Sequence, residues 1–373
     1  MPEKRVVLVG GMAAPSKAFG MVKLRLEAEG WQVDAFLGGG KPIPATLDEM
    51  LAAVERASVI LVGMSVPAEQ SKEELLVAQR AVELGKPLGL YADTFGACKR
   101  THFSPLRDKA NLVFVLNENE KHNAEGVFKN SKVVVSGNHE WEDASFPRFS
   151  REEMRAKLGI ADDEKLLLLA GHKSVSITAF LLMSVVHAVN QPLLRNRKLK
   201  VILAPHPGDG VSPKVYAEPV LYTGVPVIIV TKEKTYTRKE VSGKEPELEE
   251  RDGGLSSSDL LPAADLLVES ASTFCQAAAI QRIPVVSVLS EVSKRRNVLV
   301  FGQWDWEPVL QGVAKEVYSD VNNLDRVIYD LLNPDVLYCI GLRQKRLYPG
   351  FKEKGEFAKR IVDAMNDILF MKK

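Results

Sequence analysis

The sequence predicts an α/β protein made of two Rossmann-like domains, each with a parallel sheet, that face each other across a cleft. Three observations favour this fold. The chain has 373 residues, enough for two ordinary domains. Short β-branched runs alternate with helical stretches of about 10–15 residues, as in doubly wound sheets. The pattern stops in the polar stretch Gly137–Ala161, which contains Pro147, and then starts again, so we expect a domain boundary there.

The first domain is predicted to cover residues 1–145. Its strands are short apolar runs, and Gly10-Gly11 ends the first of them. The expected strands are Val6–Val9, Gln32–Leu37, Val59–Val62, Leu88–Tyr91, Leu112–Leu116 and Lys132–Val135. The expected helices are Ser16–Glu29, Thr46–Arg56 and Lys72–Leu84, and Gly30 and Gly85 close the first and the third.

The second domain is predicted to cover residues 146–350 and to repeat the same alternation. Its expected strands are Leu166–Leu169, Lys200–Leu203, Val227–Val230, Leu266–Val268 and Val285–Val288. Its expected helices are Arg151–Leu158, Ile177–Val189 and Phe274–Gln281. Beyond Val300 the pattern predicts only helices, over Asp320–Leu332, Asp335–Lys345 and Glu353–Leu369.

The stretch Thr231–Gly254 interrupts this rhythm. It is dense in charge of both signs and nearly free of apolar residues, which predicts a mobile surface loop. A solvated hairpin or insertion is the favoured reading of this surface segment. Its place at the end of a strand also leaves a substrate lid open.

Composition limits the kinds of partner. The net charge of +1 gives no reason to expect nucleic acid or an anionic membrane. Cys98, Cys275 and Cys339 are odd in number and far apart, which is typical of reduced thiols. The N-terminus enters a strand directly without the apolar region of a signal peptide, and no apolar run reaches about 18 residues. We therefore expect a cytoplasmic protein without a membrane span.

A βαβ unit over Asp265–Val286 is the centre of the functional prediction. Leu266–Val268 predicts a strand, a polar turn follows, and then come a small-residue helix and a second strand. The hydroxyls of Ser270, Ser272 and Thr273 fall at the helix N-terminus, where N–H groups and the helix dipole attract a phosphate. The alternative is a Ser/Thr N-cap without a ligand.

In open parallel sheets, ligands bind beyond the carboxyl ends of the strands. In the first domain this rule selects Gly10-Gly11, Ser65, Asp93-Thr94 and Asn117-Glu118. In the second it selects His172-Lys173, His206 and Glu269-Ser270.

Three of these positions suggest chemistry. His206 lies between two prolines and is able to donate to a phosphate or shuttle a proton. His172 and Lys173 follow Gly171 in a turn that suits an anion, although a plain turn is an alternative. Asp93 is a candidate general base, or else a cap of the next segment.

Several classes of enzyme lack their fingerprint. No G-x-G-x-x-G follows the first strand, and no P-loop lysine is present, so neither a Rossmann dinucleotide site nor a Walker-type ATPase is indicated. No G-x-S-x-G elbow supports a hydrolase. No pair of His or Cys at metal-ligand spacing supports a bound metal.

The layout resembles the GT-B superfamily of nucleotide-sugar enzymes. Lys132–Asp143 is similar to the end of the first domain in non-hydrolysing UDP-GlcNAc 2-epimerases and many GT-B glycosyltransferases, where a Gly-Asn pair, here Gly137-Asn138, closes the last strand. Arg151–Lys165 is similar to their connecting helix, and Ala264–Val286 to their donor-site segment. The resemblance implies that the C-terminal helix, within residues 351–373, packs back on the first domain.

The same resemblance marks departures from the epimerases. Where they carry Ser-Gly-Gly and then a Glu pair that holds the ribose, this chain has Ser270-Ala271-Ser272 and Cys275-Gln276. Gln276 still offers a neutral hydrogen bond to a hydroxyl. The epimerase start motif is absent, and His172–Ser176 replaces their His-Arg-x-Glu-Asn stretch. A His-Pro loop with a later Ser-x-Ser-Thr turn also resembles GT-B transferases that use CMP- or CDP-activated donors.

These observations predict a metal-independent glycosyltransferase that takes its sugar from a nucleotide donor and needs no other cofactor. Lys173, His206, Glu269, Ser270, Ser272, Thr273 and Gln276 would bind the donor, and Asp93, His206 and His172 are the candidate catalytic groups. A sugar-nucleotide epimerase using Asp93 with Glu118 or His172 is the second reading. A non-catalytic GT-B-like nucleotide-binding protein is the third. The sequence does not identify the acceptor, and a homodimer is compatible with it.

Overall fold

The computed structural model describes residues 4–239, 241–242, 245–301, 304–318 and 323–371. Its contacts divide the chain into two compact units. The first unit comprises Met1–Asp143, Val300–Gly302 and Phe351–Lys373, and the second comprises Ala144–Leu299 and Gln303–Gly350. The limits expected from the sequence, 145 and 350, lie close to this division.

The first unit is built on a six-stranded sheet in the order β2-β1-β3-β4-β5-β6, with every pair parallel. The strands are β1 (Arg5–Gly10), β2 (Gln32–Leu37), β3 (Val59–Gly63), β4 (Leu88–Tyr91), β5 (Leu112–Val115) and β6 (Lys132–Val135). The strands β1, β3, β4 and β5 are almost wholly buried because apolar residues fill both of their faces. The strand order reverses between β1 and β3, which makes this the switch point of the sheet.

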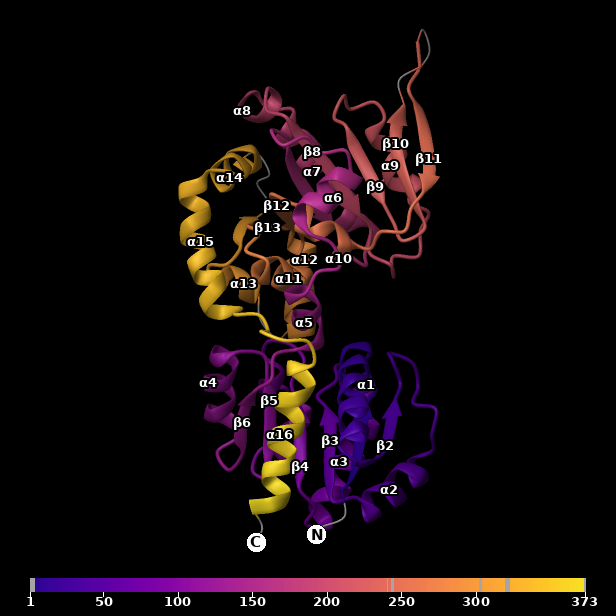
Figure 1. Cartoon of the computed structure of the whole chain (residues 1–373), viewed down its shortest axis with the longest axis vertical. Helices are drawn as coiled ribbons and strands as arrows, with labels where there is room; N and C mark the ends of the chain where they lie inside the picture. Colours follow the sequence, from indigo (N-terminus) through magenta and orange to yellow (C-terminus); the bar gives the residue numbers. More distant parts are fainter. Residues whose placement is uncertain (1–3, 240, 243–244, 302–303, 319–322, 372–373) are drawn as a thin grey trace. The chain divides into compact units, whose positions relative to one another are not determined.

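The helices of this unit cover both faces of the sheet (Figure 1). They are α1 (Ala13–Ala28), α2 (Leu47–Arg56), α3 (Lys72–Glu83), α4 (Glu118–Val127), α5 (His139–Ser145), whose last residues belong to the second unit, and α16 (Glu356–Met371). Between β3 and β5 the chain forms three short 3₁₀ turns, η1 (Ala68–Ser71), η2 (Ala97–Lys99) and η3 (Thr101–Leu106). Thr46 caps α2 through a reciprocal hydrogen-bond pair with Glu49, so the expected start of that helix is its N-cap.

The last helix, α16, belongs to the first unit although it follows the second in sequence. It packs on α1 and on β5 and β6 (Figure 1). Its buried face includes Phe357, Ile361 and Met365, each fully buried. Glu142 accepts a hydrogen bond from the Phe357 N–H at 3.1 Å and so anchors the first turn. This confirms that the C-terminal helix packs back on the first unit.

The second unit is built on an eight-stranded sheet in the order β11-β10-β9-β8-β7-β12-β13-β14. Six strands are parallel, and the hairpin β10–β11 is antiparallel. The strands are β7 (Lys165–Ala170), β8 (Leu199–Ala204), β9 (Val227–Val230), β10 (Lys234–Lys239), β11 (Glu247–Asp252), β12 (Leu266–Glu269), β13 (Val285–Leu289) and β14 (Lys315–Tyr318). The strand order reverses between β7 and β12, so the switch point lies at their carboxyl ends.

Helices flank this sheet and bury their apolar faces against it. They are α6 (Arg151–Lys157), α7 (Val175–Val189), α8 (Pro192–Arg195), α9 (Lys214–Val220), α10 (Ser257–Leu260) with the 3₁₀ turn η4 (Leu261–Ala263), α11 (Phe274–Ile280), α12 (Glu291–Phe301), α13 (Glu307–Leu310), α14 (Leu324–Leu331) and α15 (Pro334–Leu347). The long apolar helix α7 packs on α14, α8, α9 and β7. This explains why its sequence is hydrophobic on nearly every side.

The favoured reading of Thr231–Gly254, a hairpin, is confirmed, and its description as a loop without secondary structure is wrong. β10 and β11 form a hairpin that extends the sheet beyond β9 (Figure 1). The hairpin is stable because opposite charges face each other, as at Lys234 and Asp252, and because Tyr236 is only 6% exposed in the core of the unit. The charged edge strand β11 also discourages pairing with other chains.

The prediction of only helices beyond Val300 is also wrong. The strand β14 pairs in parallel with β13 at the other edge of the sheet. Only Val317 of this strand is buried, so its sequence lacks an apolar run. The helix expected from Asp320 begins at Leu324 as α14, and residues 319–322 lie outside the described residues.

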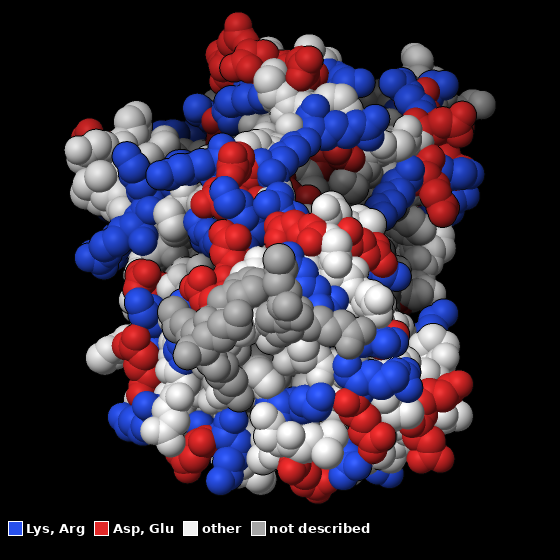
Figure 2. All heavy atoms as spheres, turned by 60° about the horizontal axis from the view of Figure 1, so that its bottom comes forward, with Lys and Arg blue, Asp and Glu red and all other residues white. Residues whose placement is uncertain are grey.

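Two further observations bear on partners. Within the described residues, none of the helices has the length and apolar character needed to cross a bilayer. On the face of the molecule shown in Figure 2, Lys and Arg atoms are interspersed with Asp and Glu atoms. A single-sign surface of the kind that attracts nucleic acid is not seen on that face.

Gly137, in the Gly-Asn pair after β6, provides a test of the first unit. Its φ is +72°, and an added Cβ would meet the Phe351 ring at 2.7 Å. We expect Gly137→Ala to lower the free energy of unfolding by about 2 kcal/mol or more, since both strain and overlap must be relieved. Urea denaturation measures this change.

Gly126→Ala is the matched control. Gly126 lies in α4, where an added Cβ meets nothing within 4 Å. There we expect a gain of about 0.5–1 kcal/mol from helix propensity. Equal effects of the two substitutions would contradict the packing of Gly137 against Phe351.

Candidate functional site

The switch point of the first unit holds a buried carboxylate that belongs to the protein itself. Glu74, on α3, accepts hydrogen bonds from Gly11 N at 2.9 Å, Ser65 N at 3.0 Å and Ser65 Oγ at 2.7 Å. Burial raises the pKa of Glu74 to about 7, although these three hydrogen bonds oppose the rise. The sequence singled out Gly11 and Ser65 as positions for a ligand, but Glu74 occupies their N–H groups.

Asp93 follows β4 at the next strand end and lies against Arg100, with 3.7 Å between Oδ1 and Nη1. The two side chains are 15% and 9% exposed. Burial raises the pKa of Asp93, and the Arg100 guanidinium acts in the opposite direction. Arg100 comes from the turn between η2 and η3, so sequence reasoning about strand ends did not find it.

At the following strand end, Asn117 and Glu118 have different surroundings. Asn117 is buried, and its side chain caps α4 by accepting from Glu120 N at 3.0 Å. The side chain of Glu118 is 79% exposed and forms an ion pair with Lys121. The Asn117 amide thus serves its own helix, and the Glu118 carboxylate faces solvent. Asp93 and Arg100, in contrast, form a buried ion pair at this edge.

The switch point of the second unit brings two loops into direct contact. An added Cβ at Gly171, after β7, would meet His206 N at 2.7 Å and the Pro205 Cα at 2.8 Å. Glycine is therefore needed for the loops that follow β7 and β8 to approach each other. This contact places His172 and His206, which are 34 positions apart, at one edge of the sheet.

Four cationic or imidazole side chains gather at this edge: His172, Lys173, His206 and Arg296. We call them the cationic cluster. Arg296 comes from α12 and contacts the Nε2 atom of His172. His172 is 6% exposed, and its Nδ1 accepts from Ser174 N at 2.9 Å. His206 Nδ1 likewise accepts from Gly208 N at 2.9 Å.

The pKa values of both histidines reflect this excess of positive charge. Burial, together with the nearby Arg296 and His206, lowers the pKa of His172 to about 4. Burial also lowers the pKa of His206; Asp209 opposes the shift, while Lys173 and Arg296 add to it. Among the described residues, Asp209 is the carboxylate that opposes the positive charge around His206. The cluster therefore presents hydrogen-bond donors and positive charge with little opposing charge, which is the electrostatic character of an anion site.

The turn after β12 is held together by its own hydrogen bonds. Glu269 is fully buried, accepts from Ser272 N at 2.5 Å and from the Ser287 hydroxyl, and has a pKa raised by burial to about 7. Ser270 Oγ bonds Ser293 Oγ at 2.9 Å. Ala271 adopts a φ of +51°, which is uncommon outside glycine. Glu269 therefore fixes the shape of the turn through its hydrogen bonds to Ser272 and Ser287.

The remaining predicted donor-binding residues differ in exposure. Ser272 Oγ accepts from Phe274 N at 3.3 Å, and Thr273 is exposed at the start of α11. Gln276 is 3% exposed on α11. Ser293 and Arg296 are one turn apart on α12, so this helix connects the turn to the cationic cluster. Both residues escaped the sequence analysis because neither follows a strand.

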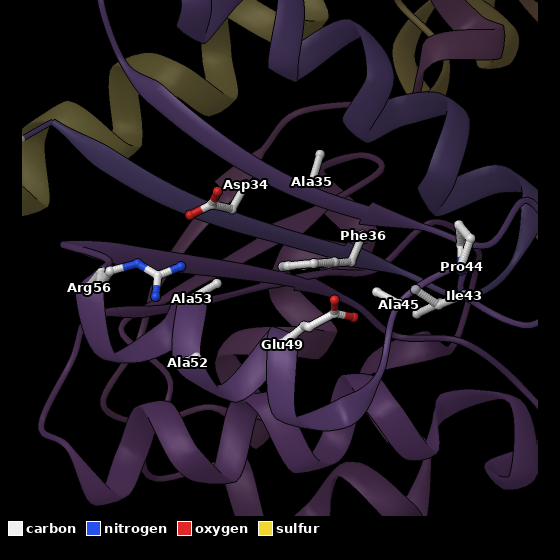
Figure 3. A pocket seen from close by; sticks show the side chains of 10 residues that line it. All are labelled: Asp34, Ala35, Phe36, Ile43, Pro44, Ala45, Glu49, Ala52, Ala53 and Arg56. Atoms are coloured by element: carbon white, nitrogen blue, oxygen red, sulfur yellow. The ribbon is translucent and has the colours of Figure 1, made fainter.

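A separate cavity of about 540 Å³ lies in the first unit between β2 and α2. Figure 3 shows the Phe36 ring in its middle, with Asp34 and Arg56 at one end. Its carboxylates already have partners, since Asp34 pairs with Arg5 at 3.1 Å and Glu49 accepts a hydrogen bond from Thr46 N at 2.7 Å. None of the site residues predicted from the sequence lines it. Among the described residues, no group of three His, Cys, Asp or Glu side chains is placed to hold a metal ion.

Comparisons with known sequences leave the family open. No family model matches the chain. A segment is 29% identical over 176 residues to GTPase Der of Chlamydia muridarum, which is 45% of this chain and 35% of the GTPase. The match thus spans about a third of that protein. The P-loop fingerprint of a GTPase is absent from this sequence, so the activity of that protein is not carried over.

Solved structures with a similar fold match nearly the whole length of this chain. The UDP-GlcNAc 2-epimerase of Neisseria meningitidis bound to UDP-GlcNAc has a TM-score of 0.61, at 14% identity over 97% of this chain and 100% of the other. A glycosyltransferase of Rickettsia africae has a TM-score of 0.60, at 10% identity over 99% of each chain. The UDP-GlcNAc 2-epimerase of Methanocaldococcus jannaschii in complex with UDP-GlcNAc and UDP has a TM-score of 0.56, at 15% identity over 97% and 99%. These likenesses confirm the resemblance predicted from the sequence: the chain has the fold of the GT-B superfamily of nucleotide-sugar enzymes.

Proposed function

We propose that this protein is a GT-B glycosyltransferase that binds a nucleotide-activated sugar on its second unit and transfers the sugar to an acceptor hydroxyl. The observation that carries the proposal is the cationic cluster of His172, Lys173, His206 and Arg296 at the switch point of the second sheet. Four donors with little opposing charge suit a diphosphate better than any neutral ligand.

The first unit is a poor place for the diphosphate. At its switch point the Glu74 carboxylate already accepts the N–H groups of Gly11 and Ser65. A phosphate there would face a buried negative charge and find these donors in use. The contrast between the two switch points supports placing the donor on the second unit.

In the proposed reaction, the leaving group is the nucleoside diphosphate. Arg296, Lys173 and the imidazole rings of His172 and His206 would stabilise the negative charge that develops on it. Thr273 and Ser272 would add hydroxyl contacts, while Ser270 and Glu269 would hold the turn in shape. The positive charge that stabilises the leaving group would thus come from protein side chains. Asp93 would accept the proton of the attacking hydroxyl.

A sugar-nucleotide epimerase is less well supported. Epimerisation needs an acid and a base around one sugar carbon, and the sequence suggested Asp93 with Glu118 or His172. The exposed Glu118 side chain, paired with Lys121, is poorly suited to proton transfer in a dry site. Only one carboxylate of that pair is buried, which fits a single general base.

Arg296 provides the first test. We expect Arg296→Gln to weaken the binding of UDP or UDP-GlcNAc by about tenfold or more, since it removes a charge-assisted hydrogen bond to the phosphates. Isothermal titration calorimetry measures the affinity, and the same titration with CMP- and GDP-sugars identifies the base.

Arg295→Gln is the matched control for Arg296. Arg295 is the next residue of α12, is 72% exposed and pairs with Glu291. We expect its replacement to leave nucleotide affinity unchanged. An equal loss in both variants would indicate general electrostatic attraction and would remove Arg296 from the site.

The pH dependence of donor binding provides the second test. In the free protein the pKa of His172 is about 4, so the ring is neutral at pH 7. A bound diphosphate raises that pKa, so that binding takes up protons and the affinity rises as the pH falls from about 8 toward 5. We expect calorimetry with UDP-GlcNAc to show this rise. His172→Asn, which keeps an acceptor for Ser174 N, should flatten it; an unchanged slope in that variant would exclude His172 as the group that takes up the proton.

Turnover provides the third test. We expect Asp93→Asn to lower the rate of sugar transfer by about 10²–10⁴-fold while nucleotide binding is retained, because the base is lost. UDP release from a panel of nucleotide sugars, with and without added sugar acceptors, measures the rate. Glu118→Gln is the control and should transfer sugar at the wild-type rate. Conversion of UDP-GlcNAc without an acceptor would indicate an epimerase, and binding without any turnover would indicate a non-catalytic protein.

A further inference from the structure

Five neighbouring side chains of the first unit contain buried polar atoms without a hydrogen-bond partner in the described structure. These atoms are Tyr91 Oη, Asp93 Oδ1, Thr94 Oγ1, Arg100 Nη1 and both ring nitrogens of His139. Buried polar groups in proteins are nearly always paired, so a concentration of unpaired ones calls for an explanation. Tyr91 is fully buried and His139 is 5% exposed, so bulk water does not satisfy them.

The five side chains come from three places that the fold brings together. Tyr91 ends β4, and Asp93 and Thr94 follow it directly. The 3₁₀ turns then return the chain so that Arg100 lies 3.7 Å from Asp93, which is too far for a hydrogen bond. The rings of Tyr91 and His139 both lie near Phe357, with centroids 5.9 and 6.5 Å from its ring.

These atoms offer donors and acceptors in alternation. Asp93 accepts, Arg100 donates, and the hydroxyls of Tyr91 and Thr94 do both. Burial lowers the pKa of His139 to about 4, so its neutral ring offers one donor and one acceptor. A hydroxyl group between Asp93 and Arg100 would accept from the guanidinium and donate to the carboxylate. Ligand hydroxyls therefore match this set better than a group that only accepts.

The surrounding charge argues against an anionic ligand. The carboxylates of Asp93 and Glu140 are close enough to Tyr91 to add to the rise in its pKa that burial causes. Glu74 also acts on Arg100, whose positive charge is already opposed by Asp93. Lys17 adds a second cation, since it acts on His139 and Glu140. The three carboxylates Asp93, Glu74 and Glu140 still outnumber the two cations, which is the reverse of the cationic cluster in the second unit. A phosphate or carboxylate would be repelled here.

We propose that Tyr91, Asp93, Thr94, Arg100 and His139 bind the hydroxyl groups of an uncharged, polyhydroxylated ligand, a sugar or polyol. The inference rests on the proposed function, in which Asp93 is the base for an acceptor hydroxyl. It adds the class of the acceptor and the residues that select it. Arg100 and Asp93 share one hydroxyl, and Tyr91 and His139 contact others.

Tyr91→Phe is the decisive variant, because it removes only a hydroxyl that has no partner in the protein. If the hydroxyl serves a ligand, the thermal midpoint of unfolding stays the same or rises, while sugar binding weakens by about fivefold or more. The probes are N-acetylglucosamine, glucose and glycerol, with glucose 6-phosphate and gluconate as anionic counterparts. Saturation-transfer NMR on the full chain measures their binding.

Tyr216→Phe is the matched control. Tyr216 is as buried as Tyr91, but its hydroxyl donates to Asp209 at 3.0 Å in the second unit. We expect this variant to melt at a lower temperature and to bind the sugar probes like the wild type. Arg100→Met, which keeps the side-chain length, should weaken sugar binding by about tenfold or more, since a charged donor is lost.

Three results would overturn the inference: the anionic probes bind better than the sugars, no neutral probe binds, or Tyr91→Phe binds sugars like the wild type. UDP titrated into the same samples reports on the second unit independently. Sugar binding without UDP binding would uphold this site and reject the proposed donor site. UDP binding without sugar binding would do the opposite.

Discussion

The contrast in charge between the two switch points is the constraint on which the assignment of roles to the two units depends. Each parallel sheet directs loops and backbone N–H groups to the edge where its strands end, and such an edge attracts negative charge. In the first unit the protein supplies that charge itself through Glu74. In the second unit the corresponding edge carries the cationic cluster, where Asp209 is the carboxylate that opposes it. An anionic ligand therefore gains far more at the second edge.

Close packing fixes both arrangements. The Glu74 carboxylate reaches the first turn only because Gly63 leaves room, since an added Cβ there would lie 2.6 Å from Oε1. At the second edge Gly171 has the same importance, because it lets the loops that follow β7 and β8 touch. The positions of the charges are thus set by close contacts at these two glycines, one in β3 and one directly after β7.

Much of the fold follows from apolar periodicity alone. Leu88–Tyr91, Lys132–Val135 and Val227–Val230 have the limits expected of them, because buried parallel strands are continuous apolar runs. The strands whose bounds escaped prediction are the hairpin β10–β11, which extends one side of the second sheet, and β14 at its other edge. Their sequences are charged, and cross-strand pairing stabilises them together with single buried side chains, Tyr236 in β10 and Val317 in β14. Local composition cannot reveal that kind of stability.

The candidate site, like the fold, could be predicted only in part from the sequence. Asp93, His172 and His206 were selected as candidates because a topological rule picks residues that follow strands. Arg296 and Arg100 were missed, because a helix and a 3₁₀ turn bring them to the strand ends through tertiary packing. Their sequence neighbours are ordinary: Arg295, beside Arg296, is a solvated arginine paired with Glu291. Only the three-dimensional contact distinguishes one arginine from the next.

The C-terminal helix α16 covers two polar side chains of the first unit, and residues 1–143 of that unit do not provide this cover. Phe357 on α16 is fully buried and packs against Tyr91, and the His139 ring lies on the same phenylalanine. Both polar side chains are buried beneath this helix, and their polar atoms have no partner among the described residues. In a dry environment a hydrogen bond is stronger than in water. The return of the chain to the first unit therefore supplies the wall that keeps this polar edge dry.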